Sequence, residues 1–209
     1  MPLTLRTLLL HHLSALRMLL VLTVITGICY PLLITGIAQA AFPSQANGSL
    51  IGGNGGATGS RLIGQDFDLP KREGRPGGPD PKWFQPRPSA AGSAGYDPTS
   101  SGASNLGPDN PVLIRMIEER RAAVAAFDGV RPSGVPVDAL TASGSGLDPH
   151  ISRAYANQQV NRVARVRGLH PATVRKLVAD HVEGRVGGFL GHGDVVNVVE
   201  LNRDVAGVA

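Results

Sequence analysis

Two glycine-rich segments carry the residue types that could bind a phosphate or another anion. Residues 143–149 read Ser-Gly-Ser-Gly-Leu-Asp-Pro. The small side chains around Ser143 and Ser145 would let backbone N–H groups point into a concavity before a helix, which favours an anion. The segment lacks the third glycine of a dinucleotide fingerprint, and Asp148 at the expected helix cap would disfavour phosphate. The pattern therefore favours a turn and a cap over an anion site.

The other segment, residues 59–64, has the G-x-x-x-x-G spacing of a phosphate-binding loop. Gln65 and Asp66 follow it, where such a loop needs Lys and then Ser or Thr to reach phosphate and Mg²⁺. Because an acidic side chain there repels phosphate, the spacing indicates a turn.

No catalytic motif is recognisable in the sequence. The patterns G-x-S-x-G, S-x-x-K and H-E-x-x-H are absent, and they mark common hydrolase sites. The carboxylates are scattered singly, so they suggest no acid–base pair. We therefore predict neither a catalytic residue nor a metal ligand. The histidines of the second half have no metal-ligand spacing: His150, His170, His181 and His192.

The region between Asp148 and Asp180 has one-sided charge, with six basic residues and no acidic one. A solvated helix face explains this most simply. A surface for an anionic partner or for lipid headgroups is the functional alternative. The six are Arg153, Arg162, Arg165, Arg167, Arg175 and Lys176.

An uncharged run at residues 18–41 must position everything that follows. A helix over these 24 residues would be about 36 Å long, enough to cross the hydrocarbon core of a bilayer. A cleaved signal peptide is the alternative, because Ala38-Gln39-Ala40 resembles a cleavage site. The apolar part of a signal peptide is usually shorter than this run, so the pattern favours an uncleaved anchor.

The flanking charges predict the orientation of the anchor. Arg6 and Arg17 precede the run, and the next basic residue is Arg61. Since positive residues near a span stay in the cytoplasm, the domain should lie on the opposite side. We expect residues 1–17 to be a cytoplasmic tail, 18–41 a transmembrane helix and 42–209 an extracytoplasmic domain, periplasmic in a Gram-negative cell.

Composition limits what this domain can do. Because two of the 20 basic residues lie in the tail, the 168 residues after the span carry 18 basic against 16 acidic residues. This balance argues against nucleic-acid binding. The only cysteine, Cys29, lies within the span, so the domain has neither a disulfide nor thiol chemistry.

Periodicity and turn residues predict an α+β domain with Gly/Pro-rich loops. Apolar runs at 49–51 and 60–63, joined by a glycine-rich stretch, indicate a hairpin. Residues 70–111, rich in Pro, Gly and Ser, indicate ordered irregular structure that aromatic residues hold to a core. Capping residues and apolar spacing predict helices over 111–128, 149–167 and 171–181, and β-branched residues predict a strand over 195–201.

Several segments together resemble a known family. They are Tyr30-Pro31-Leu32 in the span and residues 45–51, 59–67, 87–90, 96–98, 104–108, 141–148, 159–164 and 196–202. In this order, behind one span, they resemble the C subunit of the Kdp-type potassium-transporting P-type ATPase of bacteria. The resemblance covers nearly the whole chain.

The resemblance implies a non-catalytic subunit of a potassium-uptake complex in the cell (inner) membrane. Its partners would be a channel-like subunit, an ATP-hydrolysing pump subunit and a small single-span subunit, together with membrane lipids. The family is also described as a catalytic chaperone that raises the ATP affinity of the pump. Candidate partner contacts are Tyr30, Pro31, Trp83, Phe84, Arg87 and Asn105.

The chaperone description implies that the glutamine of a Q-x-x-R-V segment contacts ATP. That residue is Gln159 here, with Ser143 and Ser145 as further candidates. ATP is cytoplasmic, however, whereas the charge asymmetry places Gln159 across the membrane. A membrane-anchored envelope adaptor and an envelope hydrolase remain the alternatives to a transport subunit.

Overall fold

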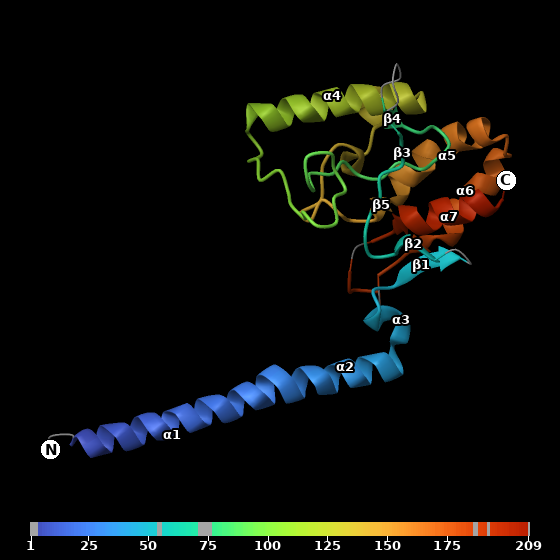
Figure 1. Ribbon diagram of the computed structural model, residues 1–209. Helices are drawn as coiled ribbons and strands as arrows, with labels where there is room; N and C mark the ends of the chain where they lie inside the picture. Colours follow the sequence, from blue (N-terminus) through green and yellow to red (C-terminus); the bar gives the residue numbers. More distant parts are fainter. Residues whose placement is uncertain (1–3, 54–55, 71–76, 186–187, 192, 209) are drawn as a thin grey trace. The chain divides into compact units, whose positions relative to one another are not determined.

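The computed structural model describes residues 4–53, 56–70, 77–185, 188–191 and 193–208. The chain divides into two compact units, Met1–Ser49 and Leu50–Ala209. The first is helical, and the second combines helices with short antiparallel strands (Figure 1). This confirms the predicted α+β class with a single long N-terminal helix.

The N-terminal unit consists mainly of one long helix, formed by α1 (Leu5–Val24), a π-helical turn η1 (Ile25–Cys29) and α2 (Tyr30–Ala41). The helix is longer than the uncharged run that predicts it, because it begins at Leu5, where the Thr4 hydroxyl accepts a hydrogen bond from the N–H of Thr7. Within the described part of the chain, it is the one helix long and apolar enough to cross a membrane.

The π-helical turn explains how this helix accommodates Pro31. Proline has no N–H, and its ring would crowd the carbonyl of the residue four positions earlier, which is Gly27. In the widened turn, the N–H of Tyr30 instead donates to the carbonyl of Ile25, five residues back. The helix thus continues through Pro31, and Tyr30 remains exposed next to the irregularity.

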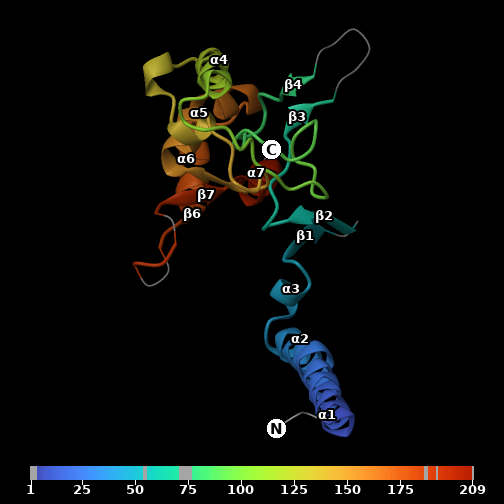
Figure 2. The same cartoon turned by 90° about the vertical axis from the view of Figure 1, so that its left-hand side faces the viewer.

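In its described residues, the second unit contains four α-helices and a three-stranded sheet. The helices are α4 (Pro111–Asp128), α5 (Arg153–Arg167), α6 (Pro171–Asp180) and α7 (Val198–Gly207). The sheet has the order β5 (His150–Ser152), β7 (Val195–Asn197), β6 (Val182–Glu183), with antiparallel neighbours. Figure 2 shows β6 and β7 beside the helices. Short 3₁₀ turns at Pro132–Gly134 and Val137–Ala139 follow α4.

Two small hairpins complete the unit. The predicted hairpin is present as β1 (Leu50–Gly53) and β2 (Gly56–Ser60), but its second strand lies in the glycine-rich stretch and ends at Ser60 instead of running over residues 60–63. Strands β3 (Asp68–Leu69) and β4 (Gly78–Pro79) form the other. Between residues 77 and 110 the chain is otherwise irregular, as predicted; residues 54–55 and 71–76 of the predicted loops lie outside the described residues.

The prediction for the second helix is wrong at its start. The Asp148 carboxylate accepts hydrogen bonds from the backbone N–H and the ring of His150 and forms a turn, not a helix cap. Residues 150–152 pair with β7, and α5 begins only after Ser152, whose hydroxyl accepts the N–H of Tyr155. A buried strand position and a buried helix position both select Ile151, so spacing alone does not separate them.

The strand predicted over residues 195–201 ends at Asn197. Its carboxamide oxygen accepts the N–H groups of Val199 and Glu200 and caps α7. Helical winding then buries Leu201 and Val205 together with Val198. Tertiary burial thereby overrides the preference of β-branched residues for strands.

The core lies where α5, α6 and α7 meet the sheet. It is built largely from valines, with few aromatic residues, and Phe84 from the irregular region is completely buried in it. Its fully buried apolar members include Ile151, Val160, Val163, Val174, Val178, Val196, Val198, Leu201 and Val205.

Candidate functional site

Residues 81–88 form an irregular segment that amide side chains hold as a neighbouring strand would. The carboxamide of Asn202 accepts the N–H of Phe84 and donates to its carbonyl, both at 2.9 Å. Gln159 does the same for Gln85, at 2.6 and 3.0 Å. Two consecutive residues thus have both backbone groups satisfied in the interior, where an unpaired group would be costly.

Arg162 adds further hydrogen bonds to this segment, and we call the bonds from Gln159, Arg162 and Asn202 to residues 81–85 the fastening network. Its Nη1 donates to the carbonyls of Pro81 and Trp83, at 2.8 and 2.9 Å, and its Nη2 donates to the Gln159 carboxamide oxygen at 2.6 Å. Its Nε lies 2.8 Å from Oδ1 of Asp128, and each of these two side chains is only 1% exposed. The guanidinium also lies 4.3 Å from the centre of the Phe127 ring. Such a buried charge is tolerable only because its partners are in place.

The charge pattern predicted for residues 148–180 therefore needs correction. Arg162 is buried, so it is not part of a solvated or lipid-facing surface. Its acidic partner Asp128 comes from α4, outside the stretch that contains no acidic residue. Two others have acidic neighbours at the surface, Arg153 with Asp194 and Lys176 with Asp180. The uncompensated charge of this face is thus smaller than the sequence suggests.

The side chains of Trp83 and Arg87, which belong to the same segment, are half-buried. The guanidinium of Arg167 lies 4.5 Å from the centre of the Trp83 ring, and the ring of Phe67 lies 6.3 Å away on a tilted plane. Arg87 pairs with Asp148 at 3.3 Å and donates to the carbonyl of Thr141. Trp83 is thus contacted from the end of α5 and from the loop of Phe67, and Arg87 from the loop before β5.

Asp148 and His150 form an electrostatic pair beside Arg87. Burial opposes ionisation of Asp148, but hydrogen bonds from His150 and the positive charges nearby outweigh it, so the pKa of Asp148 lies below its ordinary value. The hydrogen bond that the His150 ring donates to Asp148 in turn raises the pKa of His150, against burial and with help from Glu183. This cluster ties β5 to the loop that carries Arg87.

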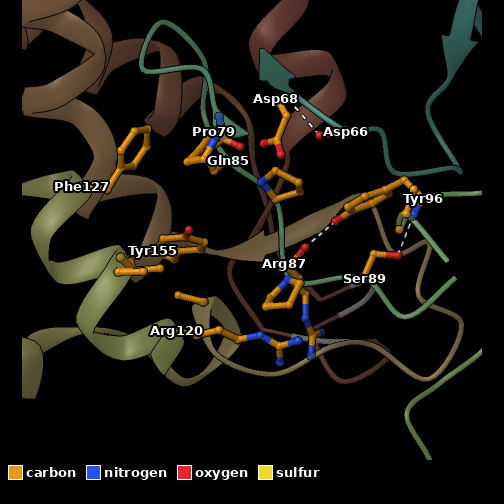
Figure 3. Close-up of a pocket in the computed structure, with 17 residues that line it drawn as sticks. Asp66, Asp68, Pro79, Gln85, Arg87, Ser89, Tyr96, Arg120, Phe127 and Tyr155 are labelled. Atoms are coloured by element: carbon orange, nitrogen blue, oxygen red, sulfur yellow. Dashed lines mark hydrogen bonds between the residues drawn. The ribbon is translucent and has the colours of Figure 1, made fainter. Parts of the chain in front are cut away.

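A cavity of about 390 Å³ lies between residues 85–88, α4 and the loop around Tyr96 (Figure 3). The Tyr96 hydroxyl donates to the carbonyl of Arg87 at 2.5 Å, and Ser89 donates to the carbonyl of Gly146. Burial and the neighbouring Asp66 raise the pKa of Asp68 at the rim. In the described ranges, no three His, Cys, Asp or Glu side chains are grouped to hold a metal ion.

Ser143 and Ser145 line a separate groove of about 1260 Å³, beside β5. The Ser145 hydroxyl accepts the N–H of Leu147, and the Ser145 carbonyl accepts the N–H of Gly102. Gly146 has a φ of +69°, and a Cβ there would lie 2.6 Å from the Gly102 carbonyl oxygen. The segment is therefore a tight turn, as predicted, and no helix begins directly after it.

The structure does not bring the nucleotide candidates together. Gln159 is completely buried, with both polar atoms of its carboxamide bonded, and it does not line the groove that holds Ser143 and Ser145. The Phe84 side chain is likewise inside the core, so only its neighbours reach the surface. Asn105 is exposed, with a φ of +53°, on the loop before α4.

The sequence did not single out Asn202, which bonds the backbone of Phe84, or Asp128, which pairs with Arg162. Gln159 and Arg162, three positions apart, fall on one helix face. That spacing hinted at a joint role, yet no local pattern pairs them with side chains from α4 and α7.

Comparison with known proteins assigns nearly the whole chain to one family. A family described as "K+-transporting ATPase, c chain" (KdpC) matches residues 12–206. The chain is 52% identical over 202 residues to the potassium-transporting ATPase KdpC subunit of Kineococcus radiotolerans, covering 97% of this chain and 96% of that protein. KdpC subunits of Sorangium cellulosum and Streptomyces coelicolor are 51% and 48% identical, over 94% and 90% of this chain and 97% and 88% of theirs. By its sequence over nearly its full length, the chain belongs to the KdpC family, the c chains of K⁺-transporting ATPases.

Proposed function

We propose that this chain is a non-catalytic subunit that stabilises an ATP-driven potassium-uptake complex. It would hold a channel-like subunit and an ATP-hydrolysing subunit together, beside a small single-span subunit. Family membership supports the complex, and one observation carries the mechanism: Gln159, Arg162 and Asn202 are hydrogen-bonded to the backbone of residues 81–85 rather than arranged around a reacting atom. Such an arrangement suits a rigid docking element.

The proposed orientation has the N-terminus in the cytoplasm and the domain outside the cell (inner) membrane. Arg6 and Arg17, both before the uncharged run, support it. An exposed Ser93→Cys variant, with Cys29 replaced by Ser, can be treated with a membrane-impermeant maleimide. Labelling of intact cells or spheroplasts supports this orientation, and labelling only after lysis contradicts it.

Docking would use two parts of the chain. In the membrane, the exposed Tyr30 next to the π-helical turn and Pro31 offers an irregular helix surface for partner helices to pack against. Outside it, Trp83, Arg87 and Asn105 would face the outer mouth of the channel-like subunit. The hydrogen bonds that hold residues 81–85 keep Trp83 and Arg87 preorganised, which reduces the entropy lost on binding.

Co-purification in a mild detergent tests this proposal. A tagged chain should bring down a large ATPase subunit and a channel-like subunit. Asn105→Arg should weaken their recovery, whereas Ala172→Arg, at an exposed position on α6, should not. An intact complex with unchanged transport after deletion of the chain would refute an assembly role. Recovery of other envelope proteins alone would favour the adaptor alternative, and labelling by a serine-reactive probe would favour the hydrolase.

Direct contact with ATP stays a prediction that rests on the family description. It would require the Gln159 carboxamide to leave Gln85 and Arg162, and the domain would have to be reached by a cytoplasmic nucleotide. A photoreactive ATP analogue on the detergent-solubilised complex can test it. Crosslinks within α5 or at residues 143–145 would support contact, and crosslinks confined to the ATPase subunit would contradict it.

A further inference from the structure

An exposed apolar cluster lies on the β6–β7 loop of the second unit. Phe189 is 74% exposed and Leu190 56% exposed, and Phe189 is the only strongly exposed phenylalanine or tyrosine among the described residues of this unit. The described part of this loop lies away from the helices, beyond β6 and β7 (Figure 2). Adjacent aromatic and aliphatic side chains at a projecting loop mark a surface that is covered in use.

The base of this loop is joined to the start of the domain. Arg61 directly follows β2 and forms ion pairs with Glu183, at 3.6 Å, and with Glu200, at 3.5 Å. Leu62 and Ile63 come next, partly exposed, and they line the same groove as Leu190. We name Leu62, Ile63, Phe189 and Leu190 the apolar rim.

Chain length limits how far the start of the domain can be from the membrane helix. The Asn47 and Gln39 side chains exchange hydrogen bonds of 3.1 and 3.3 Å, so Asn47 is held at the last turns of α2. Leu50, the first residue of β1, is only three residues further on, a reach of roughly 10 Å. Leu50 pairs with Ser60, which precedes the rim. Leu62 and Ile63, which follow Ser60 closely, are thus joined to the last turns of α2 by a short stretch of chain.

We propose that the apolar rim inserts into the headgroup region of the lipid bilayer on the domain's side of the membrane. Aromatic and aliphatic side chains are stabilised at this boundary, where their apolar surface leaves water. This short connection favours lipid over a protein surface, because Leu62 and Ile63 stay joined to the end of α2 whether or not other subunits are present. The contact would restrict how the domain tilts above its helix. This inference requires that the N-terminal helix anchors the chain in a membrane, but it does not require that the chain takes part in transport.

Two tryptophan substitutions in the full chain, reconstituted alone in phospholipid nanodiscs, test the inference. Phe189→Trp places the probe on the rim, and Val137→Trp places it at a 72% exposed position on the 3₁₀ turn after α4. Trp83 contributes the same background to both. Lipids brominated in the upper acyl chain should quench Phe189→Trp several-fold more than Val137→Trp, with emission shifted to shorter wavelength.

Equal quenching of the two variants, or none in either, would overturn lipid insertion. Absence of quenching in the chain alone, followed by a shift of Phe189→Trp emission when the other subunits are added, would also overturn it and assign the rim to a protein partner. Because the chain is tested without partners, failure here leaves the co-purification experiment unaffected, and failure of co-purification leaves this result unaffected.

Discussion

Residues 81–88 and the β6–β7 loop are both irregular, and both carry a phenylalanine, but they differ in how their backbone is held. In the first, Phe84 is completely buried and its backbone is paired by Asn202, whereas in the second Phe189 is 74% exposed. Their composition differs too, because residues 81–88 contain three prolines and no glycine, whereas residues 184–194 contain five glycines and no proline. What makes an irregular segment rigid here is a set of buried side chains from distant helices that supply its hydrogen bonds.

The largest effect on this difference should come from Arg162→Met. The change leaves Asp128 buried without its charged partner and frees the carbonyls of Pro81 and Trp83. Removing one member of a buried ion pair costs about 3–5 kcal/mol. Thermal unfolding of the domain, followed by Trp83 fluorescence in detergent, should show a large loss. Arg165→Ala, at an exposed position on the same helix, should leave the transition unchanged.

A smaller loss is expected for Asn202→Leu, which removes the partner of both Phe84 backbone groups. Leaving buried polar groups unsatisfied costs about 1–3 kcal/mol each, partly relieved by local adjustment. Gln159→Leu should cost at least as much, because it removes the two corresponding bonds at Gln85 and also the acceptor of the buried Arg162 Nη2.

The same two variants separate a structural role of Gln159 from nucleotide contact in the purified complex. If Gln159 acts by holding residues 81–88, both changes should alter the ATP concentration needed for half-maximal hydrolysis in the same direction. An effect confined to Gln159→Leu would instead favour direct contact with ATP.

The sequence allowed prediction of elements whose signals are local. Asn110 with Pro111 at the start and Gly129 at the end define α4 as expected, because capping depends on adjacent residues. The start of α5 and the end of β7 were misjudged, since burial of Ile151 and Val198 is compatible with both strand and helix.

The fastening network could not be predicted, because Asp128, Gln159 and Asn202 are brought together only by packing of three helices. Residues 84 and 202 are too far apart in the sequence for helix or strand periodicity to relate them. The candidate partner contacts stay a prediction, and among them the Phe84 side chain lies inside the domain.

The Asp148–His150 pair predicts a modest pH dependence of stability. The pKa of His150 is raised above 6.5 in the folded state, so its contribution is complete below that value and is lost as the pH rises through the folded pKa. The pKa of Asp148 is lowered, so its contribution is lost only as the pH falls below 3.8. His150→Gln should flatten the decline of the melting temperature as the pH rises above 6.5. An unchanged slope would show that other groups dominate.

The smallest effect on stability is expected at the β6–β7 loop, and one substitution made in both regions tests the comparison directly. Phe189→Ala should change the free energy of unfolding by no more than about 0.5 kcal/mol, because the side chain is mostly in contact with solvent in the isolated domain. Phe84→Ala should cost about 3–5 kcal/mol, because it opens a cavity in the core. Unfolding of the full chain in detergent measures both. A large loss for Phe189→Ala would mean that the loop packs against the domain, and the rim would then not be available to lipid.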